Sequence, residues 1–303
     1  MDYKKINLIV ELLKILQIID KIDNDFLLKG GTAINLFYRD LPRLSVDIDL
    51  VFNSLVEREQ AVIKNNKFFD EFEKSLWEIM KYKITSKNYT NNFITKIIIN
   101  SKQGPIKIEP NCIVRGTLNG FEKKTLSNIV YEKTNIYVTF NCLNKKELYA
   151  SKICAALDRQ HPRDLYDIFI MLKEENINDI DFETLFYILQ SNRPLSEIFD
   201  PQKKDISNSY KKNLTDLMLI EVSLKDLNIT MQKIIDWVQK SVFLKYYDFL
   251  LSFAEGNPDF KKLKIDISMY PGIEWKILNI KKMKKEKIIN EIKSLKKLKS
   301  KLI

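Results

Sequence analysis

The sequence predicts an α/β protein of the α+β type, with a sheet in its first part and an all-helical region after it. Two observations carry this prediction. Runs that alternate in polarity, or that are continuously apolar, are typical of strands. All such runs fall before residue 143: 26–28, 45–52, 93–99, 106–114 and 135–140. After residue 143 the apolar residues recur at helical spacing. We therefore expect two domains, residues 1–143 and residues 144–303.

Helices are expected where apolar residues return every three or four positions. In the first domain these segments are 4–20, 33–38 and 57–82. In the second domain they are 145–159, 162–173, 182–190, 208–223, 229–255 and 276–303. Pro162 suits the first position of its helix, where a backbone N–H is not needed. His161, the only histidine, is then expected at the start of that helix.

Composition and single residues exclude several classes of protein. The 303 residues include only 7 Gly and 8 Pro and are 45% hydrophobic, which is a globular profile. Cys112, Cys142 and Cys154 lie far apart without a CxxC pair, so we expect no disulfide framework and a cytoplasmic location. A single histidine cannot supply an HExxH zinc site.

No membrane segment is expected. Glu11, Lys14 and Asp20 interrupt the apolar residues of the N-terminal segment, so it has no uncharged core of a signal peptide. No run approaches the roughly 20 apolar residues that a membrane-spanning helix needs. We expect no stable association with a membrane.

Asp47 and Asp49 are the first candidate site. Because side chains alternate along a strand, Ser45, Asp47 and Asp49 share one face of the strand 45–52. Two carboxylates that close repel one another unless a cation lies between them, and Mg²⁺ commonly binds one or two carboxylates plus substrate phosphates. The alternative is an ordinary pair of surface acids.

A glycine pair upstream makes the first candidate more specific. Gly30 and Gly31 follow the strand 26–28, and Thr32 suits the N-cap of the helix 33–38. Glycines let a phosphate approach the backbone closely, and the N–H groups of a helix N-terminus favour an anion. The alternative is a tight turn and a helix cap. Residues 41–43 are expected to be a connector.

Glu109 is a third candidate carboxylate. Lys107 and Glu109 share one face of the strand 106–114. If this strand neighbours the strand of Asp47, the three acids could hold two metals or activate a nucleophile. The alternative is a cross-strand salt bridge formed by Lys107 or Glu109.

A second candidate site lies between residues 152 and 167. Lys152 and Arg159 are seven residues apart and share a helix face, while Arg163, Asp164 and Asp167 begin the next helix. Basic side chains at this density suit a triphosphate. The alternative is a buried ion-pair network between two helices, with Asp164 favoured by the helix dipole.

These motifs resemble the AbiEii/AbiGii toxin family. The residues that carry the resemblance are Lys29-Gly30-Gly31-Thr32-Ala33, Ser45-Val46-Asp47-Ile48-Asp49-Leu50, Lys152, Arg159 and Arg163-Asp164-Leu165-Tyr166-Asp167-Ile168. It covers about residues 25–175. The family's members are nucleotidyltransferase-fold toxins of type IV toxin–antitoxin or phage abortive-infection systems. The resemblance implies a polymerase-β-like core with a mixed sheet, followed by an all-helical C-terminal region.

The resemblance also implies roles for single residues. Gly30, Gly31 and Thr32 would hold phosphates, with Ser45, Arg159 and Arg163 as further nucleotide-binding residues. Asp47 and Asp49, with Glu109 as third acid, would bind Mg²⁺ or Mn²⁺. Lys152 would contact the nucleotide, and Asp164 or Asp167 would be the downstream acid. An NTP is the implied substrate, RNA (the tRNA 3′ end) the expected acceptor, and an antitoxin encoded nearby the expected partner.

The charge of the chain gathers at its end. The net charge is +10, and residues 276–303 contain 11 Lys and 2 Glu, so the remainder is nearly balanced. This segment is expected as one basic amphipathic helix. It could bind RNA phosphates, touch an anionic membrane, or pack its apolar stripe on the helical domain with solvated lysines.

Two other functions fit part of the sequence. An inactive nucleotide- or RNA-binding module would keep the fold without turnover. A glycosyltransferase also uses a DxD motif for its metal, but it predicts neither Gly30-Gly31-Thr32 nor the segment from Lys152 to Asp167.

Overall fold

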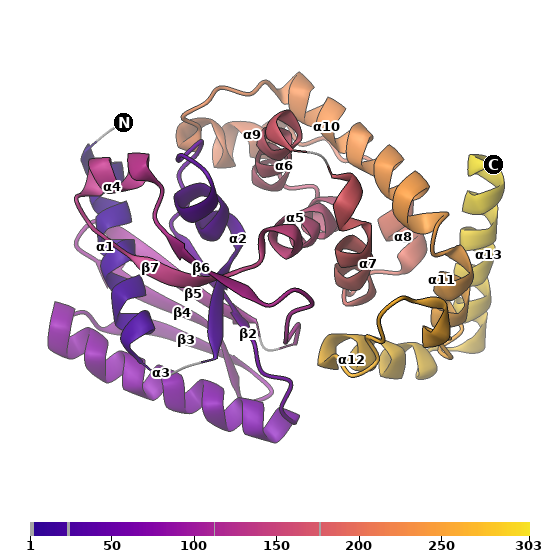
Figure 1. Cartoon of the computed structure of the whole chain (residues 1–303), viewed down its shortest axis with the longest axis horizontal. Coiled ribbons are helices and arrows are strands. Elements are labelled where there is room, and N and C mark those ends of the chain that lie inside the picture. The colour runs from indigo at the N-terminus through magenta and orange to yellow at the C-terminus, as the bar shows by residue number, and fades with distance from the viewer. Residues whose placement is uncertain (1–2, 23–24, 112, 176) are drawn as a thin grey trace. The chain divides into compact units, whose positions relative to one another are not determined.

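The protein is described from a computed structural model, which covers residues 3–22, 25–111, 113–175 and 177–303. The chain divides into two compact units (Figure 1). Unit 1 comprises Met1–Leu148 with Leu217–Ile220, and unit 2 comprises Tyr149–Asp216 with Glu221–Ile303. Each unit is considered by itself.

Unit 1 is built on a seven-stranded sheet with the order β3-β4-β5-β2-β1-β7-β6. The strands are β1 (Phe26–Lys29), β2 (Asp47–Phe52), β3 (Ile84–Thr90), β4 (Phe93–Ser101), β5 (Gly104–Asn111), β6 (Phe121–Thr125) and β7 (Thr139–Leu143). β2 pairs with β5, and β1 with β7, in parallel, whereas the other pairs are antiparallel. The sheet is therefore mixed, as expected.

The edges of the sheet were not predicted. β3 and β6 are its outermost strands, and neither has an apolar alternation because both lie largely in solvent. Their ladder hydrogen bonds come from pairing with β4 and β7, which the local sequence does not reveal. The strand expected at 135–140 begins only at Thr139, since Asn135 ends the helix α4 (Asn128–Thr134) with a positive φ.

Two long helices of unit 1 bury the faces that the apolar periodicity indicated. α1 (Tyr3–Lys21) and α3 (Arg58–Met80) contact each other, and α3 also contacts β4. Aromatic rings fill the space where α3 meets the central strands: Phe26, Phe52, Phe68, Phe69 and Phe72. This buried cluster anchors β1 and β2, the strands on which the first candidate site is built.

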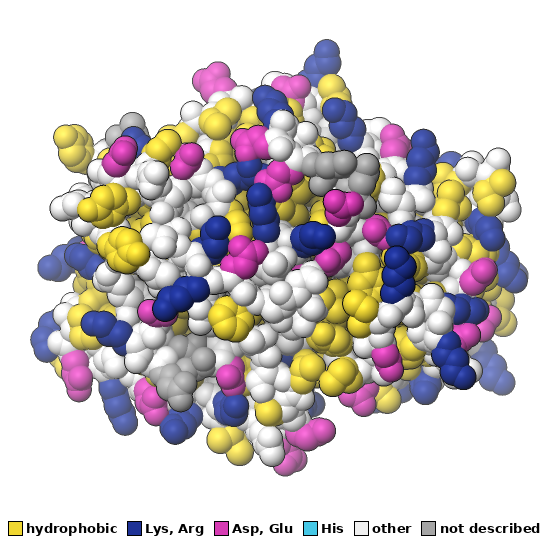
Figure 2. Space-filling model, in the orientation of Figure 1, with side chains coloured by type: hydrophobic (Ala, Val, Ile, Leu, Met, Phe, Trp, Pro, Cys, Tyr) yellow, Lys and Arg dark blue, Asp and Glu magenta, His cyan; other side chains and the backbone are white. Residues whose placement is uncertain are grey.

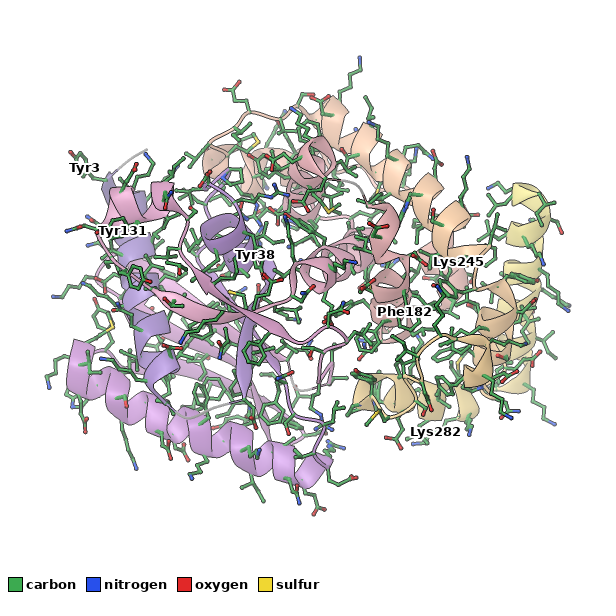
Figure 3. The ribbon with its side chains drawn as sticks, in the orientation of Figure 1. Tyr3, Tyr38, Tyr131, Phe182, Lys245 and Lys282 are labelled. Carbon is green, nitrogen blue, oxygen red and sulfur yellow. The ribbon has the colours of Figure 1, made fainter. Side chains whose placement is uncertain are left out.

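The helix after β1 begins earlier than predicted. α2 (Gly30–Thr32) starts at Gly30 and continues as a π-helix, η1 (Ala33–Tyr38). Thr32 is therefore inside the helix, with right-handed backbone angles and no side-chain cap bond, so the N-cap prediction was wrong. The far end is held by the Tyr38 hydroxyl, which donates to the Leu143 carbonyl at 3.0 Å (Tyr38 is labelled in Figure 3).

In the described part of unit 2, all regular secondary structure is helical. Its α-helices are α5 (Lys145–Arg159, whose first turn belongs to unit 1), α6 (Pro162–Glu174), α7 (Asp181–Leu189), α8 (Leu195–Phe199), α9 (Ser207–Asn213), α10 (Leu224–Trp237), α11 (Tyr247–Ala254), α12 (Pro271–Lys281) and α13 (Lys285–Leu302). The helices expected at 208–223 and 229–255 are broken, the second by the π-helix η4 (Val238–Phe243) and a turn. The all-helical C-terminal region is confirmed.

The basic end of the chain is two helices, not one. α12 ends at Lys281, and α13 begins at Lys285 after a short turn. Lys276 does not join the exposed basic face, because its ammonium is buried and donates to the Ser191 and Arg193 carbonyls at 2.5 Å. Burial lowers the pKa of Lys276 to about 8.

Cys142 and Cys154 are buried free thiols, and Cys112 lies outside the described residues. Across the described ranges, every helix is too short or too polar to span a membrane.

Candidate active site

Asp47 and Asp49 share one face of β2. Their strand neighbours Ile48 and Leu50 are fully buried on the opposite face, whereas both carboxylates are half-buried. Burial of the two apolar side chains fixes the strand's rotation about its axis. The predicted alternation is therefore present, although Ser45 lies before the strand begins at Asp47.

Glu109 lies on the strand next to the two aspartates. β5 runs parallel to β2, with Asp47 opposite Lys107 and Asp49 opposite Glu109. The condition set for a three-carboxylate group, that these strands be neighbours, is met. The register also places a lysine among the acids.

Lys107 joins carboxylates on both strands. Its Nζ lies 3.0 Å from Glu109 Oε2 and 3.6 Å from Asp47 Oδ2. Burial alone would lower the pKa of Lys107, but its hydrogen bond to Glu109 and the nearby carboxylate charges outweigh burial and raise it. The cross-strand salt bridge considered as the alternative is thus present. Within the described ranges, no three Asp, Glu, His or Cys side chains are gathered as metal ligands.

Gly30 allows Asp49 to approach the turn after β1. A Cβ added at Gly30 would overlap Asp49 Oδ2, and its φ of +72° is one that other residues rarely adopt. Lys29 faces Asp49 across the antiparallel β1–β2 pair. The turn and the carboxylate therefore fit together only because residue 30 has no side chain.

Gly31 makes room for two polar side chains. A Cβ at this position would lie 2.6 Å from Arg43 Nη2 and 2.9 Å from Ser45 Oγ. Arg43 is almost fully buried and donates from Nη1 to the Leu44 carbonyl at 2.9 Å. A guanidinium and a hydroxyl are thus packed directly against the second glycine.

Thr32 ties the turn to the start of β2. Its buried hydroxyl donates to the backbone carbonyl of Asp47 and lies 3.0 Å from Ser45 Oγ. The Asn35 side chain donates to the Gly31 carbonyl at 2.8 Å. The side chain of Thr32 therefore holds the turn and the aspartate strand together.

Arg43 packs against the candidate site, although the sequence predicts only a connector for residues 41–43. The connector is held by a segment about 170 residues away: Leu44 N–H donates to the Leu217 carbonyl at 2.8 Å, and Leu219 N–H to the Pro42 carbonyl at 2.9 Å. Locally, the sequence offered only an arginine two residues before Ser45. Nothing in residues 217–219 indicated that they pair with this connector.

The second candidate cluster lies in unit 2 and centres on Lys152. Its Nζ lies 3.1 Å from Asp164 Oδ1 and 3.2 Å from Asp167 Oδ2. All three side chains are more than 90% buried. Lys152 comes from α5 and both aspartates from α6, so the cluster joins two consecutive helices.

Arg159 completes this network from its exposed side. Its Nε and Nη2 donate to the two oxygens of Asp164 at 2.6 and 2.9 Å. Burial alone would raise the pKa of Asp164, but Lys152 and Arg159 outweigh it and hold the pKa well below its usual range. The buried ion-pair network between two helices, considered as the alternative, is present.

His161 and Arg163 lie at the start of α6. His161 is the N-cap, and its Nδ1 accepts from the Arg163 backbone N–H at 3.2 Å. Pro162 takes the first helical position. The structural role expected of His161 is confirmed.

Comparison with known proteins identifies the family. Residues 14–236 match the family described as nucleotidyl transferase AbiEii toxin, type IV TA system. The chain belongs to the AbiEii family. It is therefore a nucleotidyltransferase-family toxin of a type IV toxin–antitoxin system, as the motifs had indicated. Both candidate clusters lie within the matched residues.

A solved structure has a similar fold. MenT4, the nucleotidyltransferase toxin Rv2826c from Mycobacterium tuberculosis H37Rv, aligns with a TM-score of 0.58 over 96% of this chain and 92% of its own. The sequence identity is 12%, so the likeness concerns the fold. A search of curated proteins found no match to this chain.

The first cluster has the chemistry that a divalent cation and a phosphate need. Asp47 and Asp49 present hard oxygen donors on one strand face, as Mg²⁺ prefers. Beside them, Gly30 leaves no Cβ between Asp49 and the turn. These residues fit a metal carried with a nucleotide.

Replacing Gly30 tests the fit between the turn and Asp49. We expect Gly30→Ala to displace the Asp49 carboxylate and to lower nucleotidyl transfer by about 100-fold, the cost of a misplaced reacting group. Gly120→Ala is the matched control, because Gly120 also has a positive φ (+70°) but no atom within 4 Å of an added Cβ. Equal losses of activity in the two variants would contradict the assignment.

Replacing Asp164 tests the electrostatics of the second cluster. Asp164→Asn leaves Lys152 buried with less compensation and should lower the free energy of unfolding by about 3–5 kcal/mol at pH 7. Because the pKa of Asp164 is lower in the folded protein than in the unfolded chain, ionised Asp164 stabilises the fold at pH values above about 3.8. This stabilisation is lost as the pH falls below that value. The difference between wild type and variant should therefore shrink by about 1 kcal/mol between pH 7 and pH 3.

Urea unfolding at several pH values measures this difference. Asp158→Asn is the control, since Asp158 lies on the same helix as Lys152 and pairs with Arg193 at a half-exposed position. The control should change stability by less than about 1 kcal/mol. A pH-independent difference for Asp164→Asn would show that its charge is not what stabilises the helices.

Proposed function

We propose that this AbiEii-family protein transfers an NMP group from an NTP to a hydroxyl of RNA, with the tRNA 3′ end as acceptor. The toxin would act until an antitoxin encoded nearby neutralises it. The observation that carries the proposal is the placement of Asp47 and Asp49 on one face of β2, against the Gly30 turn. Residues 1–143 would form the catalytic domain and residues 144–303 the helical domain.

Asp47 and Asp49 would hold Mg²⁺ or Mn²⁺, with Glu109 as the third acid. The bound metal would supply positive charge at the phosphates where negative charge develops during the reaction. Lys107, whose ammonium contacts both Asp47 and Glu109, would hold these carboxylates in place before the nucleotide binds. Glu109 lies next to Asp49 in the parallel register, where it could accept the proton of the acceptor hydroxyl.

The turn after β1 would bind the phosphates of the nucleotide. Gly30 and Gly31 would let the phosphates approach the backbone, because neither has a Cβ. Thr32 and Ser45 would contribute mainly by fixing this turn to β2, since the Thr32 hydroxyl is buried in that contact. Arg43, packed against Gly31, would add positive charge behind the turn.

The second cluster would supply cationic side chains for the triphosphate. Lys152 would contact the nucleotide, and Arg159 and Arg163 would neutralise charge on the leaving pyrophosphate. Asp164 and Asp167 would set the position of Lys152, because both carboxylates lie within 3.2 Å of its ammonium. Asp164 would also orient Arg159 through its two-point hydrogen bond.

The reaction would be an in-line displacement at the α-phosphorus. The acceptor oxygen forms a bond to phosphorus, the bond to the bridging oxygen of pyrophosphate breaks, and pyrophosphate leaves with that electron pair. The hydroxyl proton passes to a carboxylate. Fixed positive charges around the phosphates stabilise the transition state more than the ground state.

Transfer of label from NTPs tests the proposal. With Mg²⁺, each of the four NTPs in turn and unfractionated tRNA, we expect label from the α-phosphate in RNA and none from the γ-phosphate. Asp47→Asn and Asp49→Asn should lower incorporation by at least about 1,000-fold, because they remove the proposed metal ligands. Asp70→Asn, at an exposed position on α3, should retain activity.

Other outcomes identify the alternatives. NTP and Mg²⁺ binding by calorimetry without any incorporation would indicate an inactive binding module. Incorporation that Asp47→Asn leaves unchanged would contradict the catalytic assignment. Transfer of sugar from a nucleotide-sugar instead of NMP would indicate a glycosyltransferase.

A further inference from the structure

Unit 2 contains a polar cleft that the proposed reaction does not use. It has a volume of about 860 Å³ and lies between the segment 193–204 and the C-terminal half of α13. The residues that line it are Arg193, Ser196, Glu197, Asp200, Gln202, Lys203, Lys204, Ser294, Lys297, Leu298 and Lys301. Leu298 is the only large apolar residue among them, so the cleft does not suit an apolar ligand.

The lining of the cleft is positively charged. Five basic and two acidic side chains give it a net charge of +3. The two acids are paired within unit 2: Lys301 lies 3.5 Å from Asp200, and Arg193 lies 4.0 Å from Glu197. Lys203, Lys204 and Lys297 have no ion pair among the described residues. Their three charges are available to an anionic ligand.

One side of the cleft is formed by α13, which is fixed by specific contacts. Leu295 and Leu298 are buried, which fixes one face of the helix against unit 2. Glu291 accepts hydrogen bonds from the backbone and the side chain of Ser196, at 2.8 and 2.6 Å. Lys297 lies on the same helix and lines the cleft together with Lys203 and Lys204. Figure 2 shows Lys and Arg side chains crowding the right-hand edge, where α13 lies in Figure 1.

We infer that this cleft binds the phosphate backbone of the RNA acceptor. Phosphodiesters carry repeated single negative charges, which lysines contact without regard to sequence. Uncompensated lysines on two segments, facing a polar cleft, complement such a chain. This inference rests on the proposed function, because it names the surface by which the toxin holds its RNA substrate.

Matched triple variants test the inference. Lys203→Gln/Lys204→Gln/Lys297→Gln removes the three unpaired charges of the cleft. Lys211→Gln/Lys212→Gln/Lys293→Gln removes three exposed charges from α9 and α13 outside it, again as a neighbouring pair and one residue of α13. Both variants lower the net charge equally, so any difference between them reports the position of the charges.

Binding is measured by fluorescence anisotropy of end-labelled tRNA at several salt concentrations, without NTP and in an Asp49→Asn background. We expect the cleft variant to bind at least about 10-fold more weakly than its parent in 0.1 M salt. The slope of log K against log salt should fall in magnitude by about 2 to 3, since each phosphate contact contributes about 0.7–0.9. The control variant should change the slope by less than about 1.

Because the binding assay contains no NTP, failure of the proposed reaction would leave the binding result intact. Equal weakening in both variants, or none in either, would overturn the inference. So would a cleft variant that keeps its tRNA affinity but loses binding to vesicles containing anionic lipid. Unfolding curves of both variants should match those of the parent within about 0.5 kcal/mol.

Discussion

The candidate active site of unit 1 depends on carboxylates placed next to one another on two interior strands of the sheet. Asp47 and Asp49 share a face of β2, and Glu109 lies beside Asp49 on β5. Like charges at this distance repel, so the arrangement requires positive charge within it. Lys107 provides that charge by contacting Asp47 and Glu109 together. The glycine turn, the Thr32 hydroxyl and the buried Arg43 then hold the strand that carries the aspartates in register with the turn.

Unit 2 also places carboxylates close together, but there the compensating lysine is buried instead of half-exposed. Asp164 and Asp167 are buried, and a buried Lys152 lies between them with Arg159 on the outer side. Removing any one partner would leave an uncompensated charge in a low-dielectric interior, which is costly. The lysines of α13 are mostly exposed, and the two ion pairs near them, Lys301 with Asp200 and Arg193 with Glu197, account for only part of the local charge. Half-buried charges therefore organise the first proposed catalytic cluster and buried charges the second, whereas exposed charges are left for a ligand.

The sequence was sufficient for the fold class and for the motifs, because both depend on local patterns. Alternation around Asp47 and helical spacing around Lys152 are visible in single segments. The sequence could not predict that β2 and β5 are parallel neighbours, because the pairing joins segments that are distant in the chain. The edge strands β3 and β6 lack an apolar pattern, and Arg43 acquires its place from residues 217–219. The division of residues 276–303 into two helices was not predicted because the turn between them, residues 282–284, contains no Gly or Pro to mark it.

Asp47 and Asp49 on β2 are proposed to form a platform for a metal and a nucleotide. Titration of Mn²⁺ followed by electron paramagnetic resonance, with a non-hydrolysable NTP analogue present, tests this claim most directly. Relative to the analogue alone, wild type should bind additional Mn²⁺ stoichiometrically, and Asp49→Asn should weaken that binding by about 100-fold, because the substitution removes a proposed metal ligand. Equal Mn²⁺ binding by the two proteins would contradict the account.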